Sequence, residues 1–191
     1  MKTLDEIAIH HQTDKASQFS RTYAKPHDYC RHLELFFAPM RDRPIKLLEI
    51  GVGGGESIQT WLEYFPNAQV VGIDIVRDTN PWNSTTERHH PRYKFFCGNQ
   101  GSFEFWQKFV SVNTTWDIII DDGSHVANDI INTFYALWPY LKSGGIYEVE
   151  DLKSAPGASV FFQPKLLNLP TGYQQADSVY FADELVIVKK K

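Results

Sequence analysis

The chain has 191 residues, of which 42% are hydrophobic and 14% aromatic, and its formal net charge is −4. This length and composition are typical of one globular domain with its own core, and they exclude a disordered chain. The acidic excess argues against a nucleic acid partner, and no apolar run is long enough to predict a membrane span. With no signal-peptide pattern, Cys30 and Cys97 are interpreted as reduced thiols of a cytoplasmic protein.

Apolar runs alternate with helical patterns along the chain. An N-terminal segment, 1–40, is expected to be helical and to form a lid, with its clearest helix at 26–37. Five strands and three further helices then follow in turn, at 46–50, 56–64, 69–73, 93–97, 102–110, 116–121, 126–141 and 145–149. Two short strands, 178–181 and 184–189, predict a closing antiparallel hairpin.

This alternation predicts right-handed β-α-β units. The expected fold class is α/β, a doubly wound, Rossmann-like, mostly parallel seven-stranded sheet with a C-terminal antiparallel hairpin strand and helices on both faces. A single domain is expected over 1–191, with its core at 45–152, an acceptor-side loop at 153–176 and the hairpin at 177–191. Ligands of such sheets bind beyond the carboxyl ends of the strands, so the polar residues there are the candidate site.

A glycine-rich turn follows the first strand, with four glycines in five residues that include Gly51 and Gly53. Such a turn lets a nucleotide-like ligand lie against the backbone and the N-terminus of the next helix. Glu56 stands where the dinucleotide pattern has its last glycine, and a carboxylate there favours a cationic or zwitterionic ligand over a pyrophosphate. Asp74, at the end of the second strand, is placed to accept hydrogen bonds from two ribose hydroxyls.

The fourth strand contains three isoleucines and ends in Asp121 and Asp122, which are followed by Gly123, Ser124 and His125. Ser124 is a good N-cap residue, so His125 is expected in the first turn of the next helix. The helix dipole disfavours an imidazolium there and keeps the ring able to accept a proton. His125 is therefore a candidate general base, and a surface histidine that caps a turn is the alternative.

The fifth strand also ends in two acids, Glu150 and Asp151. If the fourth and fifth strands are neighbours, these acids converge with Asp122, and three ionised carboxylates in a small site require a cation. Oxygen ligands favour a hard ion, with Mg²⁺ foremost and Mn²⁺ or Ca²⁺ as alternatives. The alternative is that these acids are solvated loop residues, as isolated acid pairs at strand ends usually are. Glu148 shares a face with Glu150 by strand alternation, and the pattern assigns it no role.

The glycine turn and the strand-end acids together resemble the class I S-adenosylmethionine-dependent methyltransferases. The resemblance is carried by Glu49, Gly51, Gly53, Gly55, Asp74 and the turn at 141–145. It implies that Glu49 and the glycines hold the methionine portion of the cofactor, and that Asp74 holds the ribose. Asn99 and Gln100 would contact the adenine, and Asp121 is grouped with these cofactor residues. The family often has an aspartate where this chain has Asn99. A nicotinamide or nucleotide enzyme of similar sheet order is the alternative.

The segments at 122–125 and 150–152 resemble a narrower group, the metal-dependent sugar O-methyltransferases of the macrocin and mycinamicin type. This resemblance implies that Asp122, Glu150 and Asp151 bind the metal and that His125 and Asp122 are catalytic. The Thr-Asp-Lys segment at 13–15 matches one that folds over the cofactor in that family. Family members usually carry a longer insertion after the fifth strand, so a macrolide-sized acceptor does not follow.

The sequence therefore predicts an S-adenosylmethionine- and Mg²⁺- or Mn²⁺-dependent O-methyltransferase of natural-product biosynthesis. Its expected partner is a small-molecule hydroxyl acceptor, a sugar or a glycoside, and a homo-oligomer is compatible with the sequence. Three other interpretations stay open. The first is an O-methyltransferase of catechols or small phenols, the second is a non-catalytic cofactor-binding partner subunit, and the third is a non-methyltransferase, hydroxylase-like relative that shares the metal and cofactor folds. The joint presence of Asp122, His125, Glu150 and Asp151 argues against the second.

Overall fold

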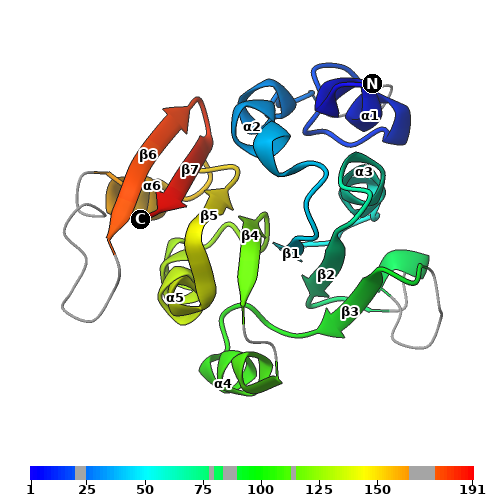
Figure 1. Ribbon diagram of the computed structural model, residues 1–191. Coiled ribbons are helices and arrows are strands. Elements are labelled where there is room, and N and C mark those ends of the chain that lie inside the picture. The colour runs from blue at the N-terminus through cyan, green and yellow to red at the C-terminus, as the bar shows by residue number, and fades with distance from the viewer. Residues whose placement is uncertain (20–24, 78–79, 84–89, 113–114, 164–174) are drawn as a thin grey trace.

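The computed structural model describes residues 1–191 apart from 20–24, 78–79, 84–89, 113–114 and 164–174. Within this described part, seven strands form one sheet in the order β3-β2-β1-β4-β5-β7-β6 (Figure 1). The strands are β1 (Lys46–Ile50), β2 (Gln69–Asp74), β3 (Tyr93–Cys97), β4 (Trp116–Asp121), β5 (Leu141–Val149), β6 (Ala176–Ala182) and β7 (Leu185–Lys190). The first five pair in parallel, and β7 runs antiparallel to both β5 and β6. The predicted fold class is thereby confirmed.

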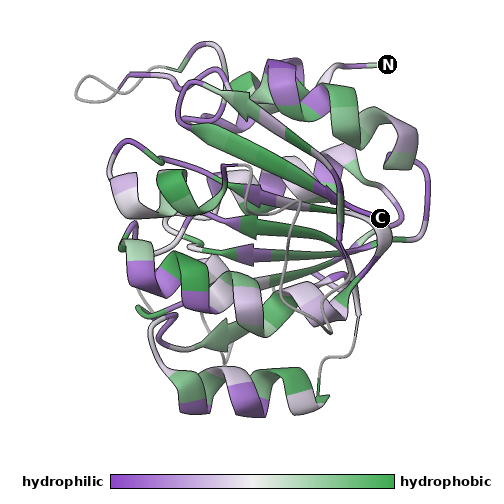
Figure 2. Ribbon diagram, turned by 90° about the vertical axis from the view of Figure 1, so that its left-hand side faces the viewer, coloured by the Kyte–Doolittle hydropathy of each residue, from purple (hydrophilic) through white to green (hydrophobic). Residues whose placement is uncertain are grey.

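Helices cover both faces of the sheet, as the end-on view in Figure 1 shows. One face carries α1 (Leu4–His11), α2 (Cys30–Phe37) and α3 (Glu56–Tyr64), and the other carries α4 (Phe103–Val112), α5 (Ala127–Leu137) and α6 (Pro156–Phe161). Three short 3₁₀ turns are η1 (Ala38–Met40), η2 (Pro81–Asn83) and η3 (Trp138–Tyr140). Each face has its own buried core, and the strands between them are mostly apolar (Figure 2). None of the described helices has the length and apolarity that a membrane span requires.

The bounds predicted for the helix at 126–141 and for the strand at 145–149 differ from those in the structure. Helix α5 ends at Leu137, and the chain continues as a 3₁₀ turn that contains Pro139. Proline has no backbone N–H and clashes with the preceding turn, so the α-helix ends before it. Strand β5 then begins at Leu141 rather than at 145, with Gly144 in the left-handed region at φ 73°.

Helix α1 lies in the N-terminal segment that was expected to be helical, although its bounds were not predicted; helix α6 was not predicted, and helix α2 is shorter than expected. Helix α1 begins with a capping box in which Thr3 and Glu6 each bond the other's backbone N–H, a signal present in the sequence. Helix α6 lies inside the expected acceptor-side loop at 153–176, of which 164–174 fall outside the described residues. Helix α2 begins at Cys30, not at 26.

The ends of β1, β2 and β4 are joined by backbone hydrogen bonds just where the glycine turn begins. Gly51 N donates to Ile73 O at 2.8 Å, and Asp122 N donates to Ile50 O at 2.9 Å. Gly51 has φ 90°, and a Cβ built on it would collide with the carbonyl oxygen of Asp122. Glycine is thus required here by backbone conformation and by the close approach of the strand that carries the acids.

Replacing Gly51 with alanine tests whether the close approach of Asp122 requires a glycine at this position. Gly51→Ala is expected to lower the free energy of unfolding by about 3 kcal/mol or more, because the new methyl group must displace backbone. Gly53→Ala is the matched control, since its φ is 52° and nothing lies within 4 Å of its Cβ position. That variant should lose only the ~1 kcal/mol of left-handed strain. Urea denaturation compares the two, and equal losses would contradict the importance of the Asp122 contact.

Candidate functional site

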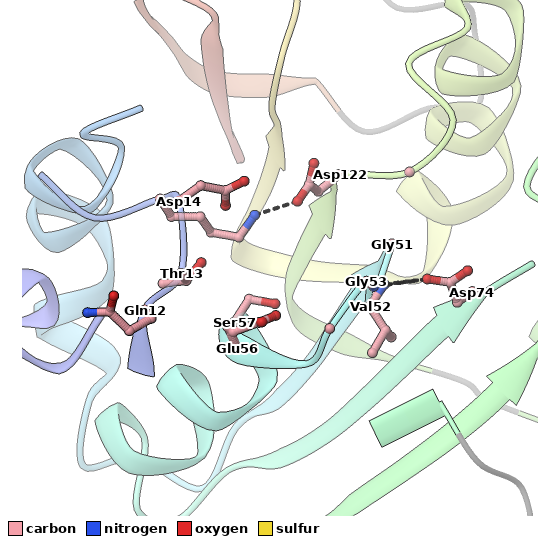
Figure 3. Close-up of a pocket in the computed structure, with 13 residues that line it drawn as sticks. Gln12, Thr13, Asp14, Gly51, Val52, Gly53, Glu56, Ser57, Asp74 and Asp122 are labelled. Carbon is pink, nitrogen blue, oxygen red and sulfur yellow. Dashed lines mark hydrogen bonds and ion pairs between the residues drawn. The ribbon is translucent and has the colours of Figure 1, made fainter. Parts of the chain in front are cut away.

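A cavity of about 310 Å³ opens at the carboxyl ends of β1, β2 and β4. The glycine turn, 51–54, forms one wall, and the segment 12–15 faces it. Figure 3 shows the turn between Asp122 on one side and Asp74 on the other, with Glu56 and Ser57 at the start of α3 below. The structure thus brings the predicted residues Gly51, Gly53, Asp74 and Asp122 to one cavity.

Asp74 holds the glycine turn in place. Its Oδ2 accepts hydrogen bonds from the backbone N–H groups of Val52 at 2.9 Å and Gly53 at 3.0 Å. Its Oδ1 accepts one from Val76 N at 2.9 Å. The carboxylate is therefore oriented by backbone donors while it lines the cavity.

A narrower cavity of about 120 Å³ adjoins the first and shares Gly51, Asp74 and Gly123 with it. Its lining combines apolar side chains with the predicted pair Asn99 and Gln100; the apolar members are Ile50, Ile73 and Ile75. A slot with apolar walls and a few polar groups suits a flat heteroaromatic ring.

Asp121 lines neither of these two cavities. It is buried, and its Oδ1 accepts a hydrogen bond from Gln100 Nε2 at 2.6 Å. Gln100 Oε1 in turn accepts one from Ser124 N at 2.7 Å. In the structure Asp121 fixes the amide of Gln100 rather than facing the cavity, and burial raises the pKa of Asp121 to about 7.

Glu49 also lies behind the cavity wall. It is fully buried and its Oε2 accepts a hydrogen bond from Ser57 Oγ at 3.0 Å. Burial raises the pKa of Glu49 to about 7, although the nearby charge of Lys15, 4.0 Å from Oε1, opposes this. Glu49 therefore supports the start of α3 behind the glycine turn.

Asp122, His125 and Asp151 converge at the ends of β4 and β5. Each offers one possible metal-ligand atom, and these atoms all lie within 4.8 Å of one another. His125 Nε2 is 3.9 Å from Asp122 Oδ1 and 3.7 Å from Asp151 Oδ2. Both His125 and Asp151 have positive φ, 53° and 54°, a conformation that non-glycine residues adopt at a cost and often at functional sites.

The expectation that His125 lies in the first turn of a helix is wrong. Helix α5 begins at Ala127, and its N-cap is Val126. Ser124 does not cap it; its Oγ accepts a hydrogen bond from Val126 N at 3.2 Å and donates one to Asp129 at 3.0 Å. The left-handed turn at His125 instead brings the imidazole to the two acids.

The role of Lys15 could not be read from the sequence. Its side chain is 1% exposed, and its Nζ lies 2.6 Å from Asp122 Oδ2 and 2.5 Å from Glu150 Oε2. Although burial opposes it, the charges of Asp122, Glu150 and Glu49 hold the pKa of Lys15 well above its ordinary value. The ammonium is thus a fixed charge among the acids. Two signals pointed toward it, the Thr-Asp-Lys segment that resembles one folding over the cofactor and the need of clustered carboxylates for a cation, but neither assigned Lys15 to these acids.

The acids at this edge retain oxygen atoms that fit a hard metal ion. Glu150 Oε1 is buried and has no hydrogen-bond partner among the described residues, as is true of both oxygens of Glu148. Burial raises the pKa of Glu148 and Glu150 well above the ordinary range, while Lys15 opposes the rise. An unsatisfied buried oxygen needs either a proton or a cation. The donor set of carboxylate oxygens fits Mg²⁺ or Mn²⁺.

A second group with metal-ligating side chains lies where α1 and α3 pack together. It consists of His10, His11 and Glu63, and His11 Nε2 is 2.8 Å from a Glu63 oxygen. The other Glu63 oxygen pairs with Lys2 at 2.9 Å. This group lines neither of the two cavities described above.

Sequence comparisons identify related proteins. The sequence model of the family described as "Methyltransferase domain" matches residues 48–152. The L-olivosyl-oleandolide 3-O-methyltransferase of Streptomyces antibioticus is 30% identical over 155 residues, which cover 78% of this chain and 36% of that protein. The mycinamicin VI 2''-O-methyltransferase of Micromonospora griseorubida is 31% identical over 151 residues, 73% of this chain and 36% of that protein. The chain therefore spans little more than a third of the length of these relatives.

Solved structures agree with the sequence comparisons. The MycE methyltransferase of the mycinamycin biosynthetic pathway, in complex with Mg and SAH, superposes with a TM-score of 0.80 at 25% identity. The superposition covers 99% of this chain and 55% of MycE. CalS11, a TDP-rhamnose 3'-O-methyltransferase of calicheamicin biosynthesis, shares the fold with a TM-score of 0.55 at 16% identity, over 83% of this chain and 77% of CalS11.

Asp121→Asn tests whether the buried carboxyl makes stability depend on pH. The folded chain raises the pKa of Asp121 from 3.8 to about 7, so between these values it binds a proton more tightly than the unfolded chain does. Stability should therefore fall as pH rises from about 4 to 7, by on the order of 1–4 kcal/mol. The asparagine keeps an oxygen acceptor for Gln100 and should reduce this fall. Glu49, Glu148 and Glu150, whose pKa values burial also raises, leave a residual dependence of stability on pH. Urea denaturation at several pH values measures it, and an unchanged slope would contradict the assignment.

Proposed function

The chain belongs to the methyltransferase-domain family that its residues 48–152 match, and we propose that it transfers a methyl group from S-adenosylmethionine to a sugar hydroxyl of a glycosylated natural product. The observation that carries the proposal is the position of Asp122. This residue lines the larger cavity and also belongs to the group with His125 and Asp151. A cofactor in the cavity and a hydroxyl beside His125 would therefore meet at one side chain.

The two adjoining cavities support the choice of cofactor. The larger one would take the methionine portion against Gly51 and Gly53, whose bare backbone allows close approach. Asp74, at the junction of the cavities, is placed for the ribose hydroxyls, and the apolar slot beside Asn99 and Gln100 would take the adenine. Glu49 and Asp121 would act from behind, through Ser57 and Gln100 respectively.

Asp122 and Asp151 would hold Mg²⁺ or Mn²⁺ in the group that they form with His125, and Glu150 would contribute its buried Oε1, which has no hydrogen-bond partner among the described residues. When bound, such an ion supplies Lewis acidity that favours ionisation of an acceptor hydroxyl. MycE, whose solved complex contains Mg and SAH, supports this part of the proposal.

His125 would act as the general base. Its Nε2 would take the hydroxyl proton as the oxygen forms its bond to the methyl carbon and the carbon–sulfur electrons return to sulfur. The carboxylates of Asp122 and Asp151, 3.9 Å and 3.7 Å from that nitrogen, would stabilise the imidazolium so formed. The left-handed backbone at His125 holds the ring in this position.

The acceptor class rests on the relatives. They are named for methylation of olivosyl, mycinamicin and rhamnosyl groups, which are all sugars or glycosides of natural products. The division of the chain into a lid segment, a core, an acceptor-side loop and a hairpin stays part of this proposal. The proposal also includes a homo-oligomeric assembly, the absence of a nucleic acid partner and a cytoplasmic location. The location is in keeping with the free thiols of Cys30 and Cys97 in the described chain.

His125→Ala is expected to lower methyl transfer to a glycoside by about 100-fold or more, because an alcohol needs a base at neutral pH. Binding of S-adenosylhomocysteine, measured by calorimetry, should stay within about twofold, since His125 lines neither cofactor cavity. A variant with full transfer activity would contradict the role of His125.

A labelled-methyl transfer assay with glycosides and catechols, run with and without a chelator, tests the reaction class. We expect glycoside methylation that is lost with the chelator and restored by Mg²⁺. Full activity in excess chelator would exclude the metal role. Catechol methylation that survives in His125→Ala would favour the phenol alternative, because a catechol ionises more easily.

A further inference from the structure

The N-terminal segment, defined here as residues 13–19 and 25–30, reaches the acids at the carboxyl edge of the sheet from outside the matched methyltransferase region. Its two parts are joined by backbone hydrogen bonds: His27 N donates to Asp14 O at 2.7 Å, and Cys30 N to Lys15 O at 3.0 Å. The segment therefore presents two buried polar side chains, Lys15 and Tyr29, on a framework with internal hydrogen bonds.

Lys15 contacts two acids that lie on neighbouring strands. Its ammonium is 2.6 Å from Asp122 Oδ2 at the end of β4 and 2.5 Å from Glu150 Oε2 at the end of β5. The dashed line that ends on Asp122 in Figure 3 marks the first of these contacts. The side chains of Lys15 and Glu150 are 1% and 3% exposed, so their contact is shielded from water, whereas Asp122 is 24% exposed.

Tyr29 holds one oxygen of the third acid, Asp151. Its hydroxyl donates a hydrogen bond to Asp151 Oδ1 at 2.7 Å, and the residue is 2% exposed. His27 Nδ1, 3.5 Å from the same oxygen, lies beside the tyrosine ring.

The contacts divide the oxygens of the three acids evenly. In each carboxylate the N-terminal segment holds one oxygen through Lys15 or Tyr29. Asp122 Oδ1 and Asp151 Oδ2 both face His125 Nε2, and Glu150 Oε1 is buried without a partner in the described chain. Donors behind metal-binding carboxylates orient the remaining oxygens and tune the affinity for the ion.

We propose that Lys15 and Tyr29 are positioning residues that hold one oxygen of Asp122, Glu150 and Asp151 and so direct the other three oxygens at a bound divalent ion. This inference rests on the metal-dependent function proposed above. Lys15 also balances part of the negative charge, so that the acids remain together before the ion binds. A purely structural role, in which the two residues only attach the segment to the core, is the alternative to be tested.

Tyr29→Phe removes a single hydroxyl and keeps the buried ring. Mn²⁺ titrations followed by electron paramagnetic resonance, with S-adenosylhomocysteine present, measure the affinity for the ion. The parent protein and the variant both carry His11→Gln in addition, so that the other possible metal group, His10, His11 and Glu63, does not bind Mn²⁺. The variant should bind Mn²⁺ about tenfold more weakly or worse, with S-adenosylhomocysteine affinity unchanged. Unchanged Mn²⁺ affinity would overturn the inference alone, whereas a parent protein without Mn²⁺ binding would overturn the metal part of the proposed function as well.

Lys15→Met tests the role of the lysine. Because Lys15 holds one oxygen each of Asp122 and Glu150 in place, Mg²⁺ should raise the melting temperature of this variant less than it raises that of the parent protein. Lys142→Met is the matched control, since Lys142 pairs with Asp117 at 2.7 Å and contacts none of the three acids. It should respond to Mg²⁺ as the parent does. Equal responses in Lys15→Met and the parent would overturn the role of Lys15, and if Lys15→Met does not fold, Tyr29→Phe decides the inference.

Discussion

The burial of acids at the carboxyl edge of the sheet is the constraint on which the rest of the structure depends. Glu49, Glu148 and Glu150 are almost completely buried, and Asp122 lies beside them. Transfer of each charge from water costs several kcal/mol unless it is compensated. The chain compensates by placing one buried ammonium, Lys15, in their midst and by raising the pKa values of the carboxyls. One ammonium is too little for all of them, which leaves the edge with a capacity for more positive charge.

Most of the sheet was predictable because its strands are buried on both faces. Three consecutive isoleucines at 118–120 are typical of a strand that is buried on both faces. The glycine turn marks the end of the neighbouring strand, β1. The start of β5 was missed because Gly144 suggests a turn, yet here it lies inside a strand at positive φ, near a shift in the pairing of β4 with β5. Local signals do not reveal such irregular pairing.

The candidate site was predictable in its residue types and less so in its geometry. The acids and His125 stand at strand ends, where the fold class alone places ligands. The conformation of His125 was not predictable, since a positive φ is uncommon in non-glycine residues, even though histidine adopts it more often than most. The position of Lys15 was hidden for another reason. Its contacts with Asp122 and Glu150 join residues 107 and 135 positions apart, and no short-range pattern encodes them.

Those sequence separations also affect how the molecule is made. During synthesis Lys15 emerges before every acid it contacts, and Glu150 emerges only after β4 and α5 are complete. Closing such long loops is slow and entropically costly, so this edge of the sheet is expected to assemble late, after the local helices. The contact of Lys15 with Glu150 cannot form until the last parallel strand has been synthesised. The ligand-binding edge is therefore expected to be completed late in folding rather than to nucleate it.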